Sequence, residues 1–575
     1  MTCEEMIYSN DYADFTINFF EGIEGAKEIY NTGCVNEITQ KLGVLHIPKT
    51  SDSLMNLEGV PYSFVPKLFG LMDSTNLENI GVKRVKNEEF LGLDGKNVMI
   101  GVIDTGITYT DSLFRTNDGR TRIGVIWDQT ISGFRKSDEN EGAEEALRPY
   151  FGTAFFAKDI DEALLKENPY EQVPSRDENG HGTFLTGVAA GNSNRDSDFE
   201  GIASGAEIAV VKLKEAKPYL KEYFGVPEGV LAYEETDIIY AIQYLLRYAD
   251  YRDKPISILI GLGSSNGGHL GLTSLERYLA SILENPGVMV SVPAGNEGNE
   301  RLHFEGRLEG LESRQEVEFN VGNGEDSLVL EFWGDAPTTF AIGFLTPEGD
   351  NISVITPRFG KEEELRLPLS DTVIYVAYQL VETYSGDELI FIRLQNPTPG
   401  LWRLMVYADG ENARRYNIWM PLRQFLKKDT YFLKAEPNNT ITIPGNAPLV
   451  TTVTAYNHQN GSIYANAGRG FITRDVAKPD LTAPGVRVTG PGLRGNFISK
   501  TGTSVAAAHA AGVFALFQEW NLRNPDLGPY YAAQVQSFFL KTAIRDVNLE
   551  YPNTIWGYGI IEIDKALDQF RILNV

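Results

Sequence analysis

The chain has 575 residues, 42% of them hydrophobic and 22% charged, which is ordinary for a globular protein but too long for one domain. Its formal net charge of −27 disfavours nucleic acid and anionic membranes as partners. With only two cysteines, Cys3 and Cys34, we expect no disulfide framework, and a reducing compartment is favoured. The first residues show neither the basic nor the apolar region of a signal peptide, so we expect cytoplasmic synthesis.

Residues 1–73 are predicted to form a small α+β unit. Strand-like runs occur at Asp14–Phe20, Leu42–Pro48 and Tyr62–Pro66, and Val35–Leu42 has helical spacing. An extended, proline-bearing segment follows. No stretch of the chain is long and apolar enough to predict a membrane span.

From Lys96 onward the pattern changes to apolar runs that alternate with amphipathic helices. Four runs are predicted to contain strands that are apolar on both faces: Asn97–Asp104, Ala206–Lys214, Ile256–Gly263 and Gly287–Gly298. A helix is predicted around 236–251. This alternation predicts a parallel sheet with helices on both faces. Such sheets carry their sites at the carboxyl ends of the strands. The stretch between Asp104 and His181 contains Thr121–Thr130, and we predict a β-hairpin over the cleft within this stretch.

Residues 305–437 interrupt this α/β pattern. Short strands at 327–335, 338–347, 389–397 and 401–409 are separated by Gly, Pro, Asn and Asp turns, without a helix of any length between them. We therefore predict an inserted antiparallel β-sandwich or jelly roll, which divides the α/β domain into a first part, 74–304, and a second part, 438–575.

Three side chains in the α/β segments are candidates for catalysis: Asp104, His181 and Ser504. Taken singly, each has an ordinary structural interpretation as a turn residue, a packed histidine and a helix N-cap. Together they are the groups that acyl transfer needs, since imidazole deprotonates a serine hydroxyl and a carboxylate orients the imidazole. Asn296, just beyond a strand end, is positioned to donate to a developing oxyanion together with the backbone N–H of Ser504.

Four motifs in this order resemble the subtilisin-like serine peptidases, the subtilase family. They are Asp-Thr-Gly at 104–106, His-Gly-Thr at 181–183, Ala-Gly-Asn-Glu-Gly at 294–298 and Gly-Thr-Ser at 502–504. The resemblance covers roughly Leu77–His303 and Asn438–Val575. It implies a subtilisin-like α/β fold, the triad Asp104, His181 and Ser504, and Asn296 as the oxyanion donor. Val505, Ala508 and Phe184 depart from the usual family residues without removing a reacting group.

The resemblance also implies how a protein or peptide substrate binds. Gly261, Leu262 and Gly263 would line the primary pocket, and Lys212, Leu213 and Lys214 would pair with the substrate backbone. Residues 1–73 would be a ferredoxin-like propeptide whose tail lies in the cleft and is cut by the enzyme itself. We place the cut between Leu71 and Thr75, in the region of Leu71, Met72, Asp73 and Ser74. His509 would be a structural histidine of the Ser504 helix.

Within the family, the chain resembles the Csp germination proteases of clostridial spores, which activate the zymogen of a spore cortex hydrolase. This implies location in the spore. Two alternatives remain open: a self-cleaved sensor or scaffold whose site stays occluded by its propeptide, and a glycan-binding role for the insert through Trp333, Trp402 and Trp419. No cofactor is expected. Family analogy allows a structural calcium, but no clustered Asp loop identifies its ligands.

Overall fold

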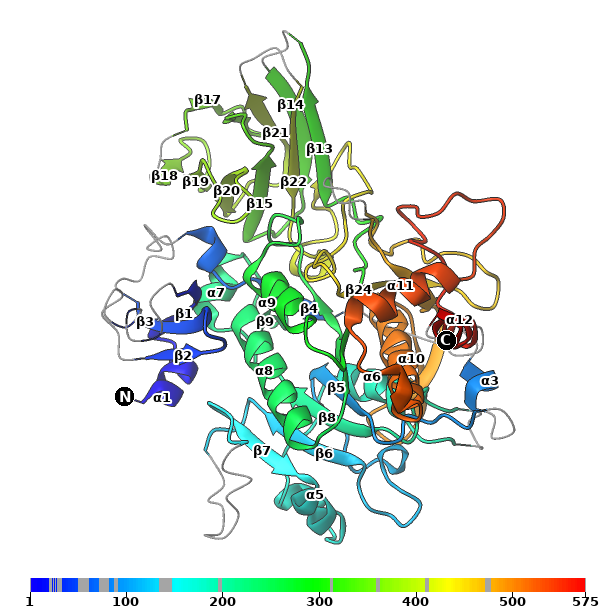
Figure 1. The fold of residues 1–575 in the computed structure, drawn as a ribbon. Helices are drawn as coiled ribbons and strands as arrows, with labels where there is room; N and C mark the ends of the chain where they lie inside the picture. The colour runs from blue at the N-terminus through cyan, green and yellow to red at the C-terminus, as the bar shows by residue number, and fades with distance from the viewer. Residues whose placement is uncertain are drawn as a thin grey trace.

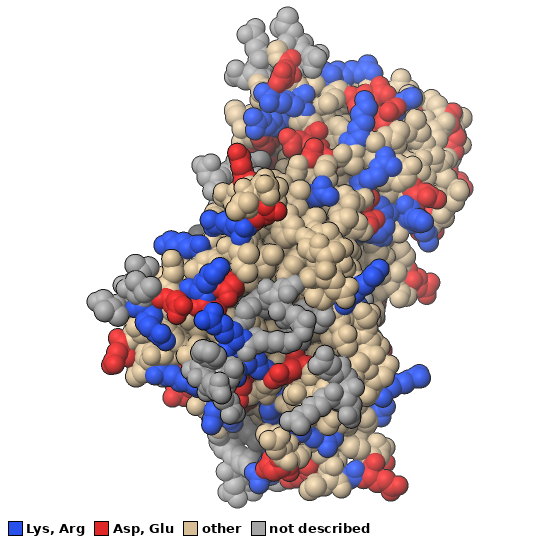
Figure 2. Space-filling view, turned by 90° about the vertical axis from the view of Figure 1, so that its right-hand side faces the viewer, with Lys and Arg blue, Asp and Glu red and all other residues tan. Residues whose placement is uncertain are grey.

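The computed structural model describes residues 2–19, 23, 25, 27, 34–49, 61–71, 82–86, 91–133, 147–194, 199–310, 314–357, 362–408, 413–470 and 477–573. Figure 1 shows three parts: an N-terminal unit on the left, a central α/β domain, and a β-sandwich at the top. The α/β domain is built from segments on both sides of the sandwich in the sequence. Figure 2 shows that Lys and Arg are interspersed with Asp and Glu over one face, despite the acidic net charge.

The N-terminal unit contains a three-stranded sheet in the order β1-β3-β2, with both pairs antiparallel. Its described elements are α1 (Cys3–Tyr8), β1 (Tyr12–Asn18), β2 (Val35–Glu37) and β3 (Leu42–Pro48). The predicted helix over Val35–Leu42 is wrong. Its first residues pair with β3, and the chain then turns so that the Ile38 N–H donates to the Leu42 carbonyl. Pairing with a neighbouring strand thus overrides the local helical spacing.

The two cysteines lie in a disulfide that joins the start of α1 to the residue before β2. Their Cα atoms are 5.4 Å apart, which is within the range that a bridge requires. The two cysteines thus form the one bridge that they allow, which a reducing compartment, as expected from the sequence, would disfavour. The bridge could not be predicted because the proximity of the two residues depends on the tertiary fold of this unit.

Three short elements lead from the N-terminal unit to the α/β domain: η1 (Tyr62–Phe64), β4 (Leu68–Leu71) and α3 (Val82–Lys86). The predicted strand over Tyr62–Pro66 is replaced by the 3₁₀ turn η1, since the flanking Pro61 and Pro66 have no N–H to donate to a sheet. The strand in this region is β4, which contributes to a second small sheet described below.

The α/β domain is centred on an eight-stranded sheet in the order β25-β24-β12-β10-β5-β8-β6-β7. Every neighbouring pair is parallel except β6 with β7 at one edge. The strands are β5 (Met99–Asp104), β6 (Ile123–Asp128), β7 (Thr153–Phe156), β8 (Glu207–Lys212), β10 (Ile256–Ile260), β12 (Val288–Pro293), β24 (Thr451–Tyr456) and β25 (Leu481–Pro484). The prediction of a parallel sheet is confirmed. The described strands between Asp104 and His181 are β6 and β7, which pair antiparallel at one edge of this sheet instead of forming a separate hairpin over a cleft.

Helices cover both faces of the sheet (Figure 1). Gly101 of β5 faces Leu245 of α8, whereas the Ser257 hydroxyl of β10 donates to the Ala511 carbonyl of α10. Gly101 pairs in register with Ile258, so the two helices lie on opposite faces. The helices of this domain are α5 (Ala157–Leu164), α6 (His181–Ala190), α7 (Pro218–Tyr223), α8 (Glu235–Tyr251), α9 (Ser274–Ile282), α10 (Thr503–Leu522), α11 (Ala532–Thr542) and α12 (Ile563–Leu573). Short 3₁₀ turns are η2 (Ser112–Phe114), η3 (Pro169–Glu171) and η6 (Pro525–Leu527).

The inserted region is a β-sandwich. One sheet has the order β13-β22-β15-β20-β19-β18 and the other β17-β16-β21-β14-β23. Side chains from both sheets, such as Phe319, Phe332, Ile392 and Trp402, form one apolar core. The elements are β13 (His303–Leu308), β14 (Arg314–Val321), β15 (Ser327–Gly334), β16 (Ala341–Leu345), β17 (Asn351–Ile355), β18 (Glu362–Arg366), β19 (Val373–Gln379), β20 (Glu388–Gln395), β21 (Gly400–Tyr407), β22 (Arg414–Trp419), η5 (Arg423–Phe425) and β23 (Tyr431–Phe432).

A hairpin of β26 (Val488–Pro491) and β27 (Phe497–Lys500) precedes α10. Within the ranges that the structure describes, none of the helices has the length and apolar character that a bilayer crossing requires.

Candidate active site

Asp104 is the last residue of β5, at the carboxyl end of a strand between β8 and β10. Its side chain is fully buried. The backbone N–H of Thr105 donates to Oδ1 at 2.8 Å, and the His181 ring approaches both carboxylate oxygens. A carboxylate held in this way is fixed in one orientation before any ligand binds.

His181 is the first residue of α6 and follows Gly180, whose φ of 85° lies in the left-handed region that favours glycine. Its Nδ1 lies 2.8 Å from Asp104 Oδ1 and 2.9 Å from Oδ2. Because a carboxylate only accepts, Nδ1 carries the proton and Nε2 is left as the acceptor. Gly182 has no room for a side chain, since a Cβ would lie 2.3 Å from the Gly106 carbonyl oxygen.

Ser504 is the second residue of α10, whose N-cap is Gly502. Its Oγ lies 3.2 Å from His181 Nε2, so the hydroxyl donates to the ring nitrogen that the Asp104 contact leaves free. The side chain is buried. The three residues are thus joined by hydrogen bonds, although 323 positions separate His181 from Ser504.

Small residues let α10 bring Ser504 to this point. Its first two turns consist largely of alanines, all buried, and they pack against α6 and against β10, β12 and β24. His509 is also buried, and its Nδ1 lies 2.7 Å from the Val505 carbonyl oxygen of the same helix. Its position inside α10 agrees with the expected structural role and is away from the triad contacts.

Asn296 follows β12 on the loop beside the start of α10. Its Oδ1 accepts from the backbone N–H of Thr503 at 3.1 Å and from the Thr503 hydroxyl at 3.2 Å. With the carbonyl side of the amide held, the Nδ2 group remains as the donor of this side chain. The first N–H groups of α10, including that of Ser504, have no partner within the helix.

Sequence reasoning missed Asp177, which organises the loop that carries His181. Its Oδ1 accepts from the Thr105 hydroxyl and from the N–H groups of Asn179 and Gly180. Its Oδ2 accepts from both the backbone and the hydroxyl of Thr183. Asp177 therefore ties the residue after Asp104 to the first turn of α6. In the sequence, Asp177 is marked only by its position four residues before the His that begins a helix. An Asp at this position is too common to indicate a functional role.

Gly261 lies against the triad. A Cβ at this residue would be 2.3 Å from Asp104 Oδ2 and 3.2 Å from His181 Cε1. The glycine is thus required for the close approach of the chain to Asp104 and His181. The next two residues form β11 (Leu262–Gly263), which pairs antiparallel with β4.

Next to Gly261 lies β4, the central strand of a small antiparallel sheet in the order β11-β4-β9. Leu71 pairs with Leu262 and Gly70 with Gly263 on one side. On the other side Leu68 and Phe69 pair with β9 (Tyr233–Glu234). A segment between the N-terminal unit and the α/β domain therefore lies in extended form between two strands of the latter. Of the residues expected to contain the cut, Leu71 ends β4, and Met72, Asp73 and Ser74 lie outside the described residues.

The expected pairing strand, Lys212–Lys214, is wrong. Its backbone is engaged inside the main sheet: the Gln129 N–H donates to the Lys212 carbonyl, and the Leu213 N–H donates to the Asp104 carbonyl. The Lys214 N–H donates to the Gln129 side chain. These backbone groups are therefore not available to an extended peptide, whereas β9 pairs with the extended segment β4.

Burial raises the pKa values of two glutamate side chains near the site. Burial raises the pKa of Glu297, next to Asn296, to about 7, although the backbone N–H of Arg423 lowers it. Burial also raises the pKa of Glu234 in β9 to about 8. In the described part of the chain, no cluster of three or more His, Cys, Asp and Glu side chains could hold a metal ion.

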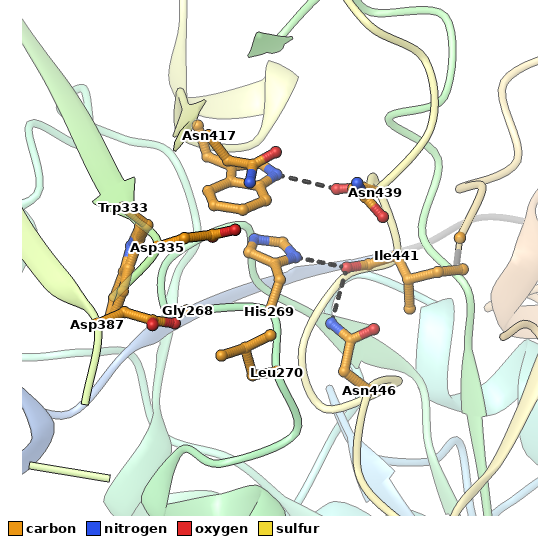
Figure 3. A pocket seen from close by; sticks show the side chains of 12 residues that line it. Gly268, His269, Leu270, Trp333, Asp335, Asp387, Asn417, Asn439, Ile441 and Asn446 are labelled. Carbon is orange, nitrogen blue, oxygen red and sulfur yellow. Dashed lines mark hydrogen bonds between the residues drawn. The ribbon is translucent and has the colours of Figure 1, made fainter. Parts of the chain in front are cut away.

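The sandwich is joined to the α/β domain by stacked rings. The Trp419 indole lies between the His269 and His303 rings, with centroid distances of 4.2 and 4.9 Å. Figure 3 shows the pocket beside His269, whose Nδ1 lies 2.9 Å from the Ile441 carbonyl oxygen. Burial lowers the pKa of His269 to about 4. Trp333, Trp402 and Trp419 are all buried, so none is displayed as a glycan-stacking platform.

A parallel sheet with a buried Asp-His-Ser arrangement at the carboxyl edge of its strands defines a serine peptidase-like site of the subtilisin type. The model of the subtilase family matches residues 95–226 and 377–559, which is more than half of the chain. The chain belongs to the subtilase family.

Several relatives are subtilisin-like proteases of Arabidopsis thaliana. SBT1.7 is 24% identical over 526 residues, covering 82% of this chain and 64% of the plant protein. SBT1.6 is 27% identical over 535 residues, covering 84% of this chain and 64% of the plant protein. The chain thus spans less than two thirds of the length of these relatives.

Among solved structures, the chain is similar to the Clostridium perfringens CspB protease. The TM-score is 0.75 with 26% sequence identity, and the match covers 85% of this chain and 96% of that one. The expected resemblance to subtilases and to the Csp group is confirmed by these comparisons.

Proposed function

We propose that the chain is a serine endopeptidase that cuts its own propeptide and then a protein substrate by limited proteolysis. The observation that carries this proposal is the continuous set of hydrogen bonds from Asp104 through His181 to Ser504, at 2.8 and 3.2 Å. This geometry lets the imidazole accept the serine proton while the carboxylate stabilises the resulting imidazolium.

The reaction would follow from these contacts. The Ser504 Oγ–H bond breaks, its proton passes to His181 Nε2, and Oγ bonds to the carbonyl carbon of the scissile peptide. The negative charge that develops on the carbonyl oxygen is stabilised by Asn296 Nδ2 and the Ser504 backbone N–H. The imidazolium then gives its proton to the leaving amine as the C–N bond breaks. A water molecule, deprotonated by His181, releases the acyl group and restores Ser504.

The propeptide assignment is supported by two features. The order β1-β3-β2 with antiparallel pairs is that of the first three strands of a ferredoxin-like unit. In addition, β4 ends at Leu71, whose partner Leu262 is next to Gly261 against the triad. A cut between Leu71 and Thr75 is within reach of Ser504 on this basis. We also propose that the sandwich is of the jelly-roll type, with β14 paired to β21 and β15 to β20.

A test compares the wild-type chain with Ser504→Ala by intact-mass and N-terminal mass spectrometry. We expect two fragments from the wild type, with a new N-terminus between residues 72 and 75, and a full-length Ser504→Ala chain. Equal cleavage of both chains, or no cleavage of either, would contradict the proposal.

Germination of spores is the proposed setting, with the zymogen of a spore cortex hydrolase as substrate. The support is the Csp resemblance of the sequence together with the structural likeness to CspB. Incubation of the processed protein with that zymogen, with the Ser504→Ala chain as control, should yield one new N-terminus. An unchanged zymogen would exclude this substrate.

A second candidate is a self-cleaved sensor or scaffold without turnover. The occupied cleft and the buried Ser504 side chain favour it. Such a protein would process itself once and then fail to react with a fluorophosphonate probe or with added peptides. Labelling of Ser504 after processing would instead favour the peptidase.

A further inference from the structure

The side chains of β4 alternate between two surroundings. Phe69 belongs to the apolar core of the α/β domain and Leu71 packs against that core. Leu68 belongs to another apolar cluster, which also contains Leu422 and Phe425 from the segment that follows the last long strand of the sandwich. Because alternate residues of a strand point to opposite sides, Gly70 faces the same way as Leu68, toward this returning segment.

At Gly70 the returning segment leaves no space for a side chain. A Cβ built on this residue would lie 2.9 Å from Leu422 Cδ1 and 2.7 Å from Gln424 Cδ, and it would overlap the Gln424 amide nitrogen. The backbone does not require glycine here, because Gly70 has no positive φ and forms regular antiparallel pairs with β11. Glycine is therefore required at residue 70 only because a side chain would not fit there.

The returning segment is anchored rather than loose. Leu422 is 1% exposed. The next residue, Arg423, donates from Nε to Glu300 Oε2 at 3.1 Å and from Nη2 to the carbonyls of Glu300 and Thr430. Its backbone N–H donates to Glu297, beside Asn296. Leu422 is thus fixed, whereas Gln424 is exposed and its side chain can turn toward solvent.

We propose that Leu422 and Gln424 make the subsite facing Gly263 specific for glycine, so that substrates of this enzyme carry a glycine at the position that pairs with Gly263. The inference rests on the proposed peptidase function, since a substrate strand is taken to occupy the place of β4. Alanine fits only when Gln424 turns away and the end of the Leu422 side chain shifts by a few tenths of an ångström, and larger or β-branched residues collide with Leu422. The sandwich thereby contributes directly to sequence specificity.

The rate of self-cleavage tests this, because Gly70 is itself the residue in the subsite. Intact-mass time courses should show Gly70→Ala cut about tenfold more slowly than the wild type and Gly70→Val more than about 100-fold more slowly. Adding Gln424→Ala to Gly70→Ala should return the rate to within about threefold of the wild type, and Leu422→Ala should accelerate Gly70→Val. The matched control replaces Gln395, an exposed glutamine of the sandwich. Adding Gln395→Ala to Gly70→Ala should leave the slow cleavage rate unchanged.

The same Gly70 substitutions in a Ser504→Ala chain show by thermal melting whether they fold. If Gly70→Val does not fold, the inference is tested by comparing the cleavage rate of Gly70→Ala with that of the double variant Gly70→Ala and Gln424→Ala. Wild-type rates for the Gly70 variants, or slowed cleavage that neither Gln424→Ala nor Leu422→Ala relieves, would overturn the inference. Failure of the proposed function is a separate result: an uncut wild-type chain, or cleavage of Ser504→Ala.

Discussion

At the scale of single residues, Asn296 obtains its orientation from one neighbour. Both polar groups of Thr503, the N–H and the hydroxyl, donate to its Oδ1. The Thr503 hydroxyl also accepts from the Gly295 N–H at 3.1 Å. Thr503 thus fixes the orientation of the Asn296 amide, and under the proposed function it is a positioning residue for the oxyanion donor.

Replacing Thr503 by Val should therefore act through Asn296. We expect Asn296→Ala to slow self-cleavage about 100- to 1,000-fold. Thr503→Val should slow it about tenfold alone and hardly at all in the Asn296→Ala chain, since neighbouring residues that share a contact are not additive. The four rates of this double-mutant cycle are measured by mass spectrometry. An equal effect of Thr503→Val in both backgrounds would contradict the assignment.

Glu297 predicts a dependence of stability on pH. Its pKa is raised by burial from 4.5 to about 7, so the folded state holds its proton more tightly than the unfolded state. Its contribution to stability is complete below pH 4.5 and is lost as the pH rises to about 7. Glu297→Gln should keep the Arg423 contact and remove this loss, which is about 3 kcal/mol. Thermal melting of Ser504→Ala chains with and without the substitution, between pH 5 and 8, checks this; parallel curves would refute it.

At the scale of elements, the start of α6 depends on Asp177. This carboxylate accepts five hydrogen bonds that join the Thr105 turn to the first turn of α6. His181 therefore keeps its place through a side chain that touches no reacting atom.

We expect Asp177→Ala to lower the free energy of unfolding by about 2–4 kcal/mol, because five donors lose a charged acceptor. Self-cleavage should slow as well. The control is Asp118→Ala, an exposed turn residue whose loss should change stability by less than about 0.5 kcal/mol. Chemical denaturation measures both. Equal stabilities for the two variants would show that Asp177 does not organise the helix start.

Sequence reasoning reached the triad but not the elements around it. Asp104, His181 and Ser504 were found because their residue types and neighbouring glycines form a chemical set. The strand β9 has only two residues and no periodic signal, so its pairing with β4 cannot be predicted, and the family resemblance points to Lys212–Lys214 instead. The Val35–Leu42 stretch has helical spacing, yet β3 recruits its first residues into a sheet. The contact between Gly70 and Gln424 joins residues from distant segments and has no local signature.

At the scale of the whole molecule, buried charges hold the N-terminal unit on the α/β domain. Asp14 of β1 is 2% exposed and accepts from Lys217 Nζ at 2.8 Å and from His46 Nδ1 at 2.6 Å. Burial raises the pKa of Asp14, but Lys217 and His46 outweigh it and lower the pKa well below its ordinary value. His46 belongs to the N-terminal unit itself, whereas Lys217 comes from the α/β domain, so the Lys217 contact exists only while the two parts are together.

Lys217→Met should weaken this attachment by about 3–5 kcal/mol, since it leaves Asp14 buried without its cation. After self-cleavage, size-exclusion chromatography should show the N-terminal fragment separating from the Lys217→Met protein but travelling with the wild type. Lys221→Met, which removes a surface pair with Glu215, serves as the control and should behave as wild type. Co-elution of the fragment with every variant would contradict the expectation.

The central place of β4 has a consequence for handling the protein. Removing that strand would uncover the facing backbones of β9 and β11 at once, each with unsatisfied N–H and C=O groups. Exposed sheet edges of this kind can pair with other extended segments, including those of a second molecule of the same protein. Protein from which the N-terminal fragment has been removed should therefore aggregate. Adding a short peptide with the sequence of β4 should reduce this aggregation.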